Sequence, residues 1–291
     1  MTTRLPAIFS VVCLSILLGA CAGGPAPASR RPGYSGALPG RGPQVRSSSY
    51  ILVDAGTGAT LAASNAHTPR QVASTQKLLM ALVVLDQGNL AKRVLIQPSD
   101  KAVGRGGVTV SAFRAGDTAT RHQLLTASLV KSANDMVQAL ARDVGGTEAR
   151  FMQMMNAKAR QLGMRSSYFA NPHGMPASGQ HSTAADMAIC ARAAYHSGFI
   201  RRAAAMRNYT FRTGSGRTIA LKATNHLLEK MSACNGLKTG YTDAAGPCLI
   251  SSAARNGRGV ILVQLHSQSG NARWDDARNA LEWGLRRVSG R

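Results

Sequence analysis

The stretch VASTQKLLMALVVLDQG, from Val72 to Gly88, decides how the rest of the chain folds around it. From Leu78 to Leu85 every residue is apolar, which is typical of a helix buried on nearly every side. Yet Ser74 stands at its start and Lys77 follows one turn later, and a lysine cation is costly to bury. Two explanations are open at this point. Either Lys77 extends its amine into water and Ser74 caps the helix, or the two side chains carry out chemistry.

The spacing of Ser74 and Lys77 is a weak signal by itself. Ser128 and Lys131 have the same S-x-x-K spacing, so at least one of the two matches is a coincidence. The pattern gains meaning only when further motifs accompany it.

The N-terminal residues have the composition of an export signal. In residues 1–20, Arg4 precedes the run LPAIFSVVCLSILL, which is too short to predict a transmembrane span. The run ends in Leu18-Gly19-Ala20-Cys21, which resembles a bacterial lipobox, so we expect a lipoprotein signal peptide and a lipid on Cys21. The alternative is ordinary signal cleavage after Ala20 or Ala22. Residues 21–47, rich in proline and glycine, are predicted to form a tether. We therefore expect an exported protein of the periplasm or cell envelope, held at a membrane through Cys21.

Net charge and cysteine count narrow the possible partners. A formal charge of +22, from 35 basic and 13 acidic residues, favours an anionic partner. The basic residues are scattered and aromatic residues make up 5% of the chain, so an anionic envelope polymer, or simply a solvated basic surface, fits better than nucleic acid. Cys190, Cys234 and Cys248 make no disulfide framework, although a single bridge between Cys234 and Cys248 stays open. The histidines have no metal-ligand spacing, so neither a metal site nor a cofactor is predicted.

The order of the predicted elements gives the fold class. We expect a hairpin over 50–63, helices over 74–88, 122–131, 135–144, 147–162 and 183–196, strands over 237–242, 248–254 and 259–265, and an amphipathic helix over 272–287. Strands from both ends of the chain can pair in one antiparallel sheet flanked by helices, with an all-helical lobe of about 86–205 inserted between them. The prediction is an α+β fold in which residues 48–291 form a single domain.

Three short motifs fall at the joins of this predicted architecture. They are Ser74-Thr75-Gln76-Lys77 at a helix start, Ser132-Ala133-Asn134 between two helices, and Lys238-Thr239-Gly240 on a strand. A serine hydroxyl is a poor nucleophile until a nearby base takes its proton, and residues three apart on a helix share a face. Because burial lowers the pKa of an amine, a buried Lys77 is suited to be that base. A second cation such as Lys238 would lower its pKa further.

With these motifs in this order, the sequence resembles the serine-type D-alanyl-D-alanine carboxypeptidases, the low-molecular-mass penicillin-binding proteins. The resemblance runs from about residue 50 to residue 287. It includes the stretches Asn171–Met175 (NPHGM), Ser182–Ala188 (STAADMA) and Gly236–Thr242 (GLKTGYT). It implies a penicillin-recognising fold, peptidoglycan stem peptides as substrates, β-lactam antibiotics as covalent inhibitors, and no cofactor.

The resemblance also implies a set of catalytic residues. Ser74 would be the nucleophile and Lys77 its base. Ser132 would relay a proton toward the leaving amine, and Asn134 would hold both Lys77 and the substrate amide.

A second implied set binds the substrate. Lys238 and Thr239 would receive its terminal carboxylate, and Gly240 would let the substrate lie close along the strand. The backbone amide of Tyr241 would help that of the nucleophile to hold the oxyanion. Arg273 is either a second carboxylate contact or an ordinary surface arginine.

The motifs leave open which member of the class this is. A class A β-lactamase needs a glutamate about three dozen residues beyond the second motif, and none of Glu148, Glu229 and Glu282 lies there. We therefore predict slow, long-lived acylation by penicillins and a carboxypeptidase that releases a terminal D-alanine. Because the chain ends soon after the third motif, the C-terminal β-domain of the common carboxypeptidases is expected to be absent. A D,D-endopeptidase that cuts crosslinks is the alternative, and a non-catalytic wall-binding lipoprotein is a third.

Overall fold

The structure is a computed structural model that describes residues 1–2, 42–104 and 112–289. Nearly all of the predicted signal peptide, Cys21 and most of the predicted tether lie outside the described residues. Among the helices that are described, none combines the length and the apolar character that a membrane crossing needs.

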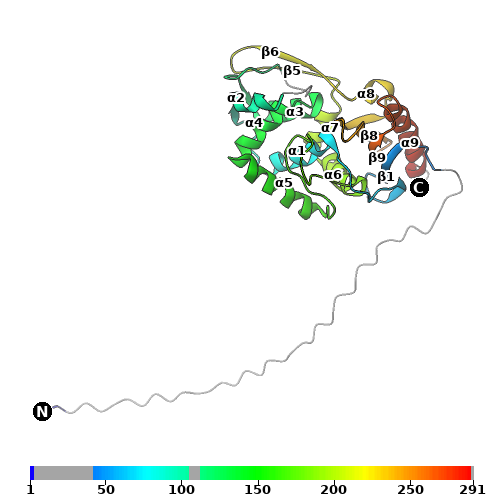
Figure 1. The fold of residues 1–291 in the computed structure, drawn as a ribbon, viewed down its shortest axis with the longest axis horizontal. Helices are drawn as coiled ribbons and strands as arrows, with labels where there is room; N and C mark the ends of the chain where they lie inside the picture. Colours follow the sequence, from blue (N-terminus) through cyan, green and yellow to red (C-terminus); the bar gives the residue numbers. More distant parts are fainter. Residues whose placement is uncertain (3–41, 105–111, 290–291) are drawn as a thin grey trace. The chain divides into compact units, whose positions relative to one another are not determined.

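Within the described residues, five strands form one antiparallel sheet in the order β2-β1-β9-β8-β7 (Figure 1). They are β1 (Ser47–Asp54), β2 (Thr60–Ser64), β7 (Cys234–Gly240), β8 (Cys248–Arg255) and β9 (Arg258–Ser267). Ile51 of β1 pairs with Val263 of β9, so strands from the two ends of the sequence share one sheet. The predicted antiparallel sheet and the α+β fold class are confirmed.

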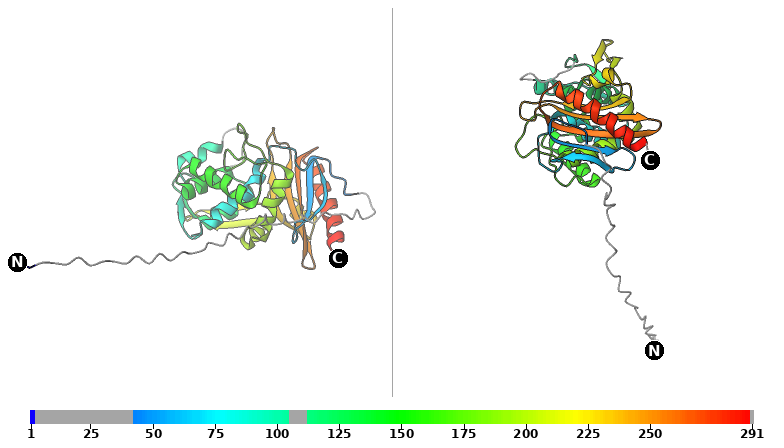
Figure 2. Two further views of the ribbon diagram at one scale, coloured as in Figure 1. Left: turned by 90° about the horizontal axis from the view of Figure 1, so that it is seen from below. Right: turned by 90° about the vertical axis from the view of Figure 1, so that its right-hand side faces the viewer.

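Helices cover both faces of this sheet (Figure 2). On one face, α9 (Ala272–Ser289) buries Leu281 and Leu285 against Leu52 and Leu262. On the other face, α6 (Ala184–His196) packs on β1 and β9. Because both faces are covered, most residues of β8 and β9 are buried and the alternation of apolar and polar residues is lost.

The segment between β2 and β7 is mainly helical. Its centre is α1 (Lys77–Asp86), in which every residue from Lys77 to Val84 is buried, as the apolar run predicts. Thr120, Thr147 and Thr183 cap three of the surrounding helices by accepting a backbone N–H of the first turn. The remaining elements are α2 (Pro98–Lys101), α3 (Arg121–Lys131), α4 (Asn134–Gly145), α5 (Glu148–Leu162), α7 (Gly198–Ala204), α8 (Leu227–Lys230), β3 (Arg93–Leu95), β4 (Thr118–Thr120), β5 (Asn208–Arg212), β6 (Thr218–Lys222) and the 3₁₀ turns η1 (Ala73–Gln76) and η2 (Ala102–Gly104).

The sequence pattern did not predict the short elements α2, α7, α8, β3 and β4, and two further features differ from the predicted elements. The buried helix begins at Lys77 and not at Ser74, because η1 precedes it, and no side chain caps either element. The hairpin formed by β5 and β6 occupies a segment for which the sequence pattern predicts no strand. Its strands are only five residues long and alternate exposed with buried positions, so little apolar sequence marks them.

The disulfide that the sequence left open does not form. Cys234 pairs with Ala253, whereas Cys248 pairs with Gly240, so the two cysteines lie at opposite ends of the β7–β8 ladder. Cys190, Cys234 and Cys248 are all free.

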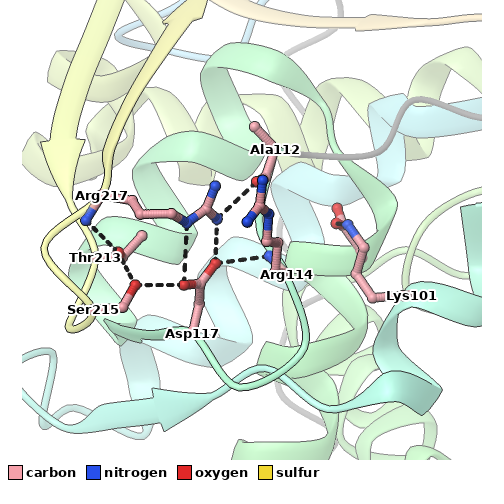
Figure 3. Close-up of polar contacts among 8 residues, drawn as sticks. Lys101, Ala112, Arg114, Asp117, Thr213, Ser215 and Arg217 are labelled. Atoms are coloured by element: carbon pink, nitrogen blue, oxygen red, sulfur yellow. Dashed lines mark hydrogen bonds and ion pairs between the residues drawn. The ribbon is translucent and has the colours of Figure 1, made fainter.

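The tip of the β5–β6 hairpin is tied to the loop before β4 by a buried carboxylate, that of Asp117 (Figure 3). Arg217 forms an ion pair with Asp117. Ser215 Oγ and the Arg114 backbone N–H donate to it, each at 2.7 Å. Burial alone would raise the pKa of Asp117, but these hydrogen bonds and the charge of Arg217 outweigh burial and lower the pKa to about 2. Two segments distant in sequence are thus held together by one acid.

We predict that Asp117→Asn makes the protein less stable at neutral pH by on the order of 2 kcal/mol. A carboxyl whose folded pKa is depressed stabilises the fold above about pH 4, and this contribution is lost as the pH falls toward 2. Urea unfolding at several pH values measures both effects. The exposed pair of Glu229 and Lys222 supplies the control, since Glu229→Gln should cost less than about 1 kcal/mol. Equal acid sensitivity of wild type and Asp117→Asn between pH 4 and 2 would contradict the assignment.

Candidate active site

Ser74 is positioned by the turn η1 and by two glycines that pack against it. Ala73 has a positive φ of 47°, which turns the backbone just before Ser74. A Cβ at Gly174 would lie 2.2 Å from the Ala73 carbonyl oxygen, and one at Gly240 would lie 3.1 Å from the Ser74 nitrogen. Larger residues at either position would therefore push their backbone segments away from the serine.

Lys77 is buried completely, and its hydrogen bonds in the described part of the chain all join it to predicted catalytic residues. Its Nζ lies 2.8 Å from Ser74 Oγ, 2.5 Å from Asn134 Oδ1, and 2.8 and 3.3 Å from the carbonyl oxygen and Oγ of Ser132. Ser132 adopts a left-handed conformation, with φ 66°, between α3 and α4. This sharp turn brings Ser132 and Asn134 to the same amine.

The surroundings of Lys77 favour a neutral amine. Burial lowers the pKa of Lys77 well below its usual value, and the charge of Lys238 lowers it further, while Asp135 acts in the opposite direction. Among the described residues, no ion pair involves Lys77. A neutral amine has a lone pair that can accept a proton, so the site contains a base in contact with a hydroxyl.

A second pair of basic groups lies along β7. Lys238 is buried and its Nζ donates to the Thr239 carbonyl oxygen at 2.9 Å. Burial and the charge of Arg273 lower the pKa of Lys238 to about 7. Arg273 Nη1 donates to the carbonyl oxygens of Gly240 and Cys248, each at 3.2 Å. In the described part of the chain neither cation has an acidic partner, so an anionic ligand fits between them.

These groups surround one cavity of about 640 Å³ beside the edge strand β7. Most of the predicted site residues line it, whereas Lys77 and Lys238 lie buried beneath its surface. Arg273 also lines the cavity, a position that favours a carboxylate contact over an ordinary surface arginine. The lining residues are Ser74, Ser132, Asn134, Met175, Pro176, Thr224, Thr239, Gly240, Tyr241, Thr242, Asp243, Ala244 and Arg273.

Sequence reasoning missed several residues at this cavity. Thr224 Oγ1 lies 2.7 Å from Thr239 Oγ1, and Asp243 accepts a hydrogen bond from the exposed Tyr241 hydroxyl at 3.0 Å. The His173 carbonyl oxygen lies 3.4 Å from Ser74 Oγ. Of these three residues only His173 had a sequence signal: it does not line the cavity itself, but it belongs to the NPHGM stretch, as does the lining residue Met175. Thr224 lies in a loop without a motif.

The second S-x-x-K match is structural. Ser128 is buried in the middle of α3, and its Oγ donates to the Leu124 carbonyl oxygen at 2.7 Å. Among the described residues, its hydroxyl makes this hydrogen bond and none to Lys131. Lys131 is half-buried at the end of the helix.

The fold and the site together define a class. An antiparallel sheet between helices, with a serine at a cavity and a buried lysine behind it beside the edge strand, is the arrangement of the penicillin-recognising serine proteins. More narrowly, the chain belongs to the D-alanyl-D-alanine carboxypeptidase family, whose sequence model matches residues 38–269. The predicted family membership is confirmed.

Named relatives agree with this assignment. D-alanyl-D-alanine carboxypeptidase DacD of Escherichia coli is 34% identical over 254 residues, which cover 83% of this chain and 64% of the relative. D-alanyl-D-alanine carboxypeptidase DacB2 of Mycobacterium tuberculosis is 31% identical over 248 residues, 84% of each protein. The chain thus spans somewhat less than two thirds of the E. coli relative and most of the mycobacterial one.

Solved structures show the same fold. The DD-transpeptidase of Streptomyces K15 superposes with a TM-score of 0.80 at 31% identity, over 84% of this chain and 99% of that one. A D-alanyl-D-alanine carboxypeptidase of Mycobacterium tuberculosis gives a TM-score of 0.79 at 29% identity, over 87% and 95% of the two chains. The predicted penicillin-recognising fold is therefore confirmed.

Proposed function

We propose that this protein is a serine D,D-carboxypeptidase that removes the terminal D-alanine from peptidoglycan stem peptides through an acyl-enzyme on Ser74. The observation that carries the proposal is the 2.8 Å contact between the Nζ of the fully buried Lys77 and the Oγ of Ser74, which lines the cavity. The names of the relatives supply the reaction class. A non-catalytic wall-binding protein would have no need for a buried, uncompensated lysine, which costs free energy.

In acylation, neutral Lys77 takes the proton of Ser74 as Oγ attacks the carbonyl carbon of the penultimate D-alanine. The backbone N–H groups of Ser74 and Tyr241 hold the oxyanion, and one such donor is worth about 3 kcal/mol in comparable sites. The tetrahedral intermediate then breaks its C–N bond. Ser132 Oγ, 3.3 Å from Lys77 Nζ, passes the proton from Lys77 to the leaving amine of D-alanine.

In deacylation, a water molecule attacks the ester carbonyl and gives a proton to Lys77. The ester C–O bond breaks, Ser74 Oγ recovers a proton from Lys77, and the shortened peptide leaves as a carboxylic acid. Asn134 Oδ1, 2.5 Å from Lys77 Nζ, keeps the amine directed at the serine through both halves of the reaction.

The free carboxylate of the terminal D-alanine explains the basic groups along β7. Thr239 and Arg273 line the cavity, and Lys238 lies buried behind them. A carboxylate placed there would neutralise two neighbouring cations that have no acidic partner in the described part of the chain. Its hydrogen bonds would be charge-assisted and hence strong.

The fate of the acyl-enzyme separates the proposed reaction from its alternatives. Attack by water gives carboxypeptidase activity on a stem peptide or endopeptidase activity on a crosslink, while attack by an amine gives transpeptidation, the activity named for the Streptomyces K15 structure. Endopeptidase activity stays the alternative. β-Lactams would acylate Ser74 in the same way and leave slowly, because residues 166–185 contain no carboxylate to activate a hydrolytic water.

We also propose that the protein works outside the cytoplasm, tethered to a membrane by a lipid on Cys21. The signal-like residues 1–20 and the lipobox-like ending support this. The proline- and glycine-rich residues 21–47 would span the distance between the membrane and the wall.

We predict that the purified protein forms a covalent adduct with a fluorescent penicillin, seen by intact mass, and that Ser74→Ala forms none. The matched control is Ser128→Ala, the other S-x-x-K serine, which should acylate like the wild type because Ser128 faces away from the cavity. Product analysis on a stem pentapeptide and on a crosslinked muropeptide then compares the two hydrolytic activities. A folded wild type that forms no adduct would rule out the proposed mechanism.

We predict that cells expressing the full chain incorporate labelled palmitate into it and that Cys21→Ala abolishes the label. The variant should also be released from the membrane fraction by salt, because the lipid on Cys21 is the proposed anchor. Persistent labelling of Cys21→Ala would contradict the lipid assignment.

A further inference from the structure

Arg273 is half-buried, and its hydrogen bonds within the described residues all come from one of its three nitrogen atoms. Its Nη1 donates to two carbonyl oxygens at the loop end of the β7–β8 hairpin, those of Gly240 and Cys248. Its Nε is buried and has no hydrogen-bond partner in the structure. A long side chain with contacts at one atom can adopt several rotamers, so another group has to fix the guanidinium plane.

The indole of Trp274 is that group. The Arg273 guanidinium carbon lies 4.3 Å from the centre of the Trp274 ring. Trp274 is only 6% exposed and is anchored in the apolar cluster between α9 and the sheet. The ring of His226 stacks on the same indole, with centroids 5.4 Å apart and planes within 4°. His226 precedes α8, which packs against α9, so two elements fix the ring on which the arginine rests.

We propose that Trp274 is a positioning residue, which holds the Arg273 guanidinium flat so that its free N–H edge meets the terminal carboxylate of the substrate. This inference rests on the proposed carboxypeptidase function. A carboxylate side chain in place of the indole would also fix Arg273, but it would neutralise the cation and compete with the substrate. An aromatic face stabilises the cation and leaves its charge and its donors available.

The same helix contains a matched pair away from the cavity. The Arg287 guanidinium carbon lies 4.3 Å from the centre of the Trp283 ring, and neither residue lines the cavity. Removing the indole of Trp283 therefore removes the same kind of contact, from the same helix, without touching the proposed carboxylate site.

The experiment compares two substrates, diacetyl-lysyl-D-alanyl-D-alanine and its C-terminal amide, which lacks the carboxylate. The readout is the ratio of kcat/KM for the acid to kcat/KM for the amide, because loss of folded enzyme lowers both values equally and leaves the ratio unchanged. Active sites are counted with fluorescent penicillin. We expect the wild type to prefer the acid and Arg273→Ala to lose most of that preference.

Trp274→Leu keeps an apolar side chain but removes the aromatic face, so the preference for the acid should fall by about three- to tenfold, mainly through KM. Trp274→Phe should retain most of it, and Trp283→Leu should retain all of it.

If Trp274→Leu keeps the wild-type ratio while Arg273→Ala loses the preference for the acid, the inference is overturned and the proposed function stays intact. A ratio that falls equally in Trp283→Leu would also overturn it. A wild type that neither cleaves the substrates nor binds penicillin covalently would instead refute the proposed function.

Discussion

The desolvation of one amine, that of Lys77, is the constraint on which the rest of this structure depends. An uncompensated cation in a protein interior is strongly unfavourable, and the described residues offer Lys77 hydroxyl, amide and carbonyl partners but no ion pair. These partners suit a neutral amine, which avoids the cost of a buried charge. A neutral amine in contact with a serine hydroxyl can accept its proton and so act as a base. Three parts of the fold enclose the Lys77 amine. The helix α1, which begins with Lys77, lies at the centre of the other helices, and the turn at Ser132 closes one side. The edge strand β7 closes another side, where Gly240 packs against Ser74.

Much of this site could be predicted from the sequence because local rules place its parts. The apolar run from Leu78 to Val84 predicts a buried helix, and the structure buries each of those residues. Ser74 and Lys77 face each other although Ser74 lies in a 3₁₀ turn and not in the predicted α-helix. Both helix types bring residues three apart onto one face. The strands at the two ends of the chain also pair as their patterns suggest.

Other parts of the site could not be predicted because they depend on contacts between distant segments. Thr224 reaches Thr239 from a loop without a motif, and Asp117 joins the unpredicted β5–β6 hairpin to the loop before β4. Arg273 was ambiguous in the sequence because an arginine before a helix is common on surfaces. Only the packing of α9 on the sheet shows that it faces the cavity and rests on Trp274. Local pattern thus predicted the groups that are proposed to react, and tertiary packing showed the groups that are proposed to orient them.

The central claim is that burial makes Lys77 a neutral base for Ser74, and a direct titration of that amine tests it most directly. Nuclear magnetic resonance of protein labelled with ¹⁵N at the lysine side chains, with Lys77 assigned by comparison with Lys77→Met, follows the charge of this one group. The account predicts a pKa well below the usual 10.5, and a rate of penicillin acylation that rises with pH as Lys77 loses its proton. A Lys77 amine that stays charged up to its usual pKa, in a protein that still acylates at neutral pH, would contradict the account.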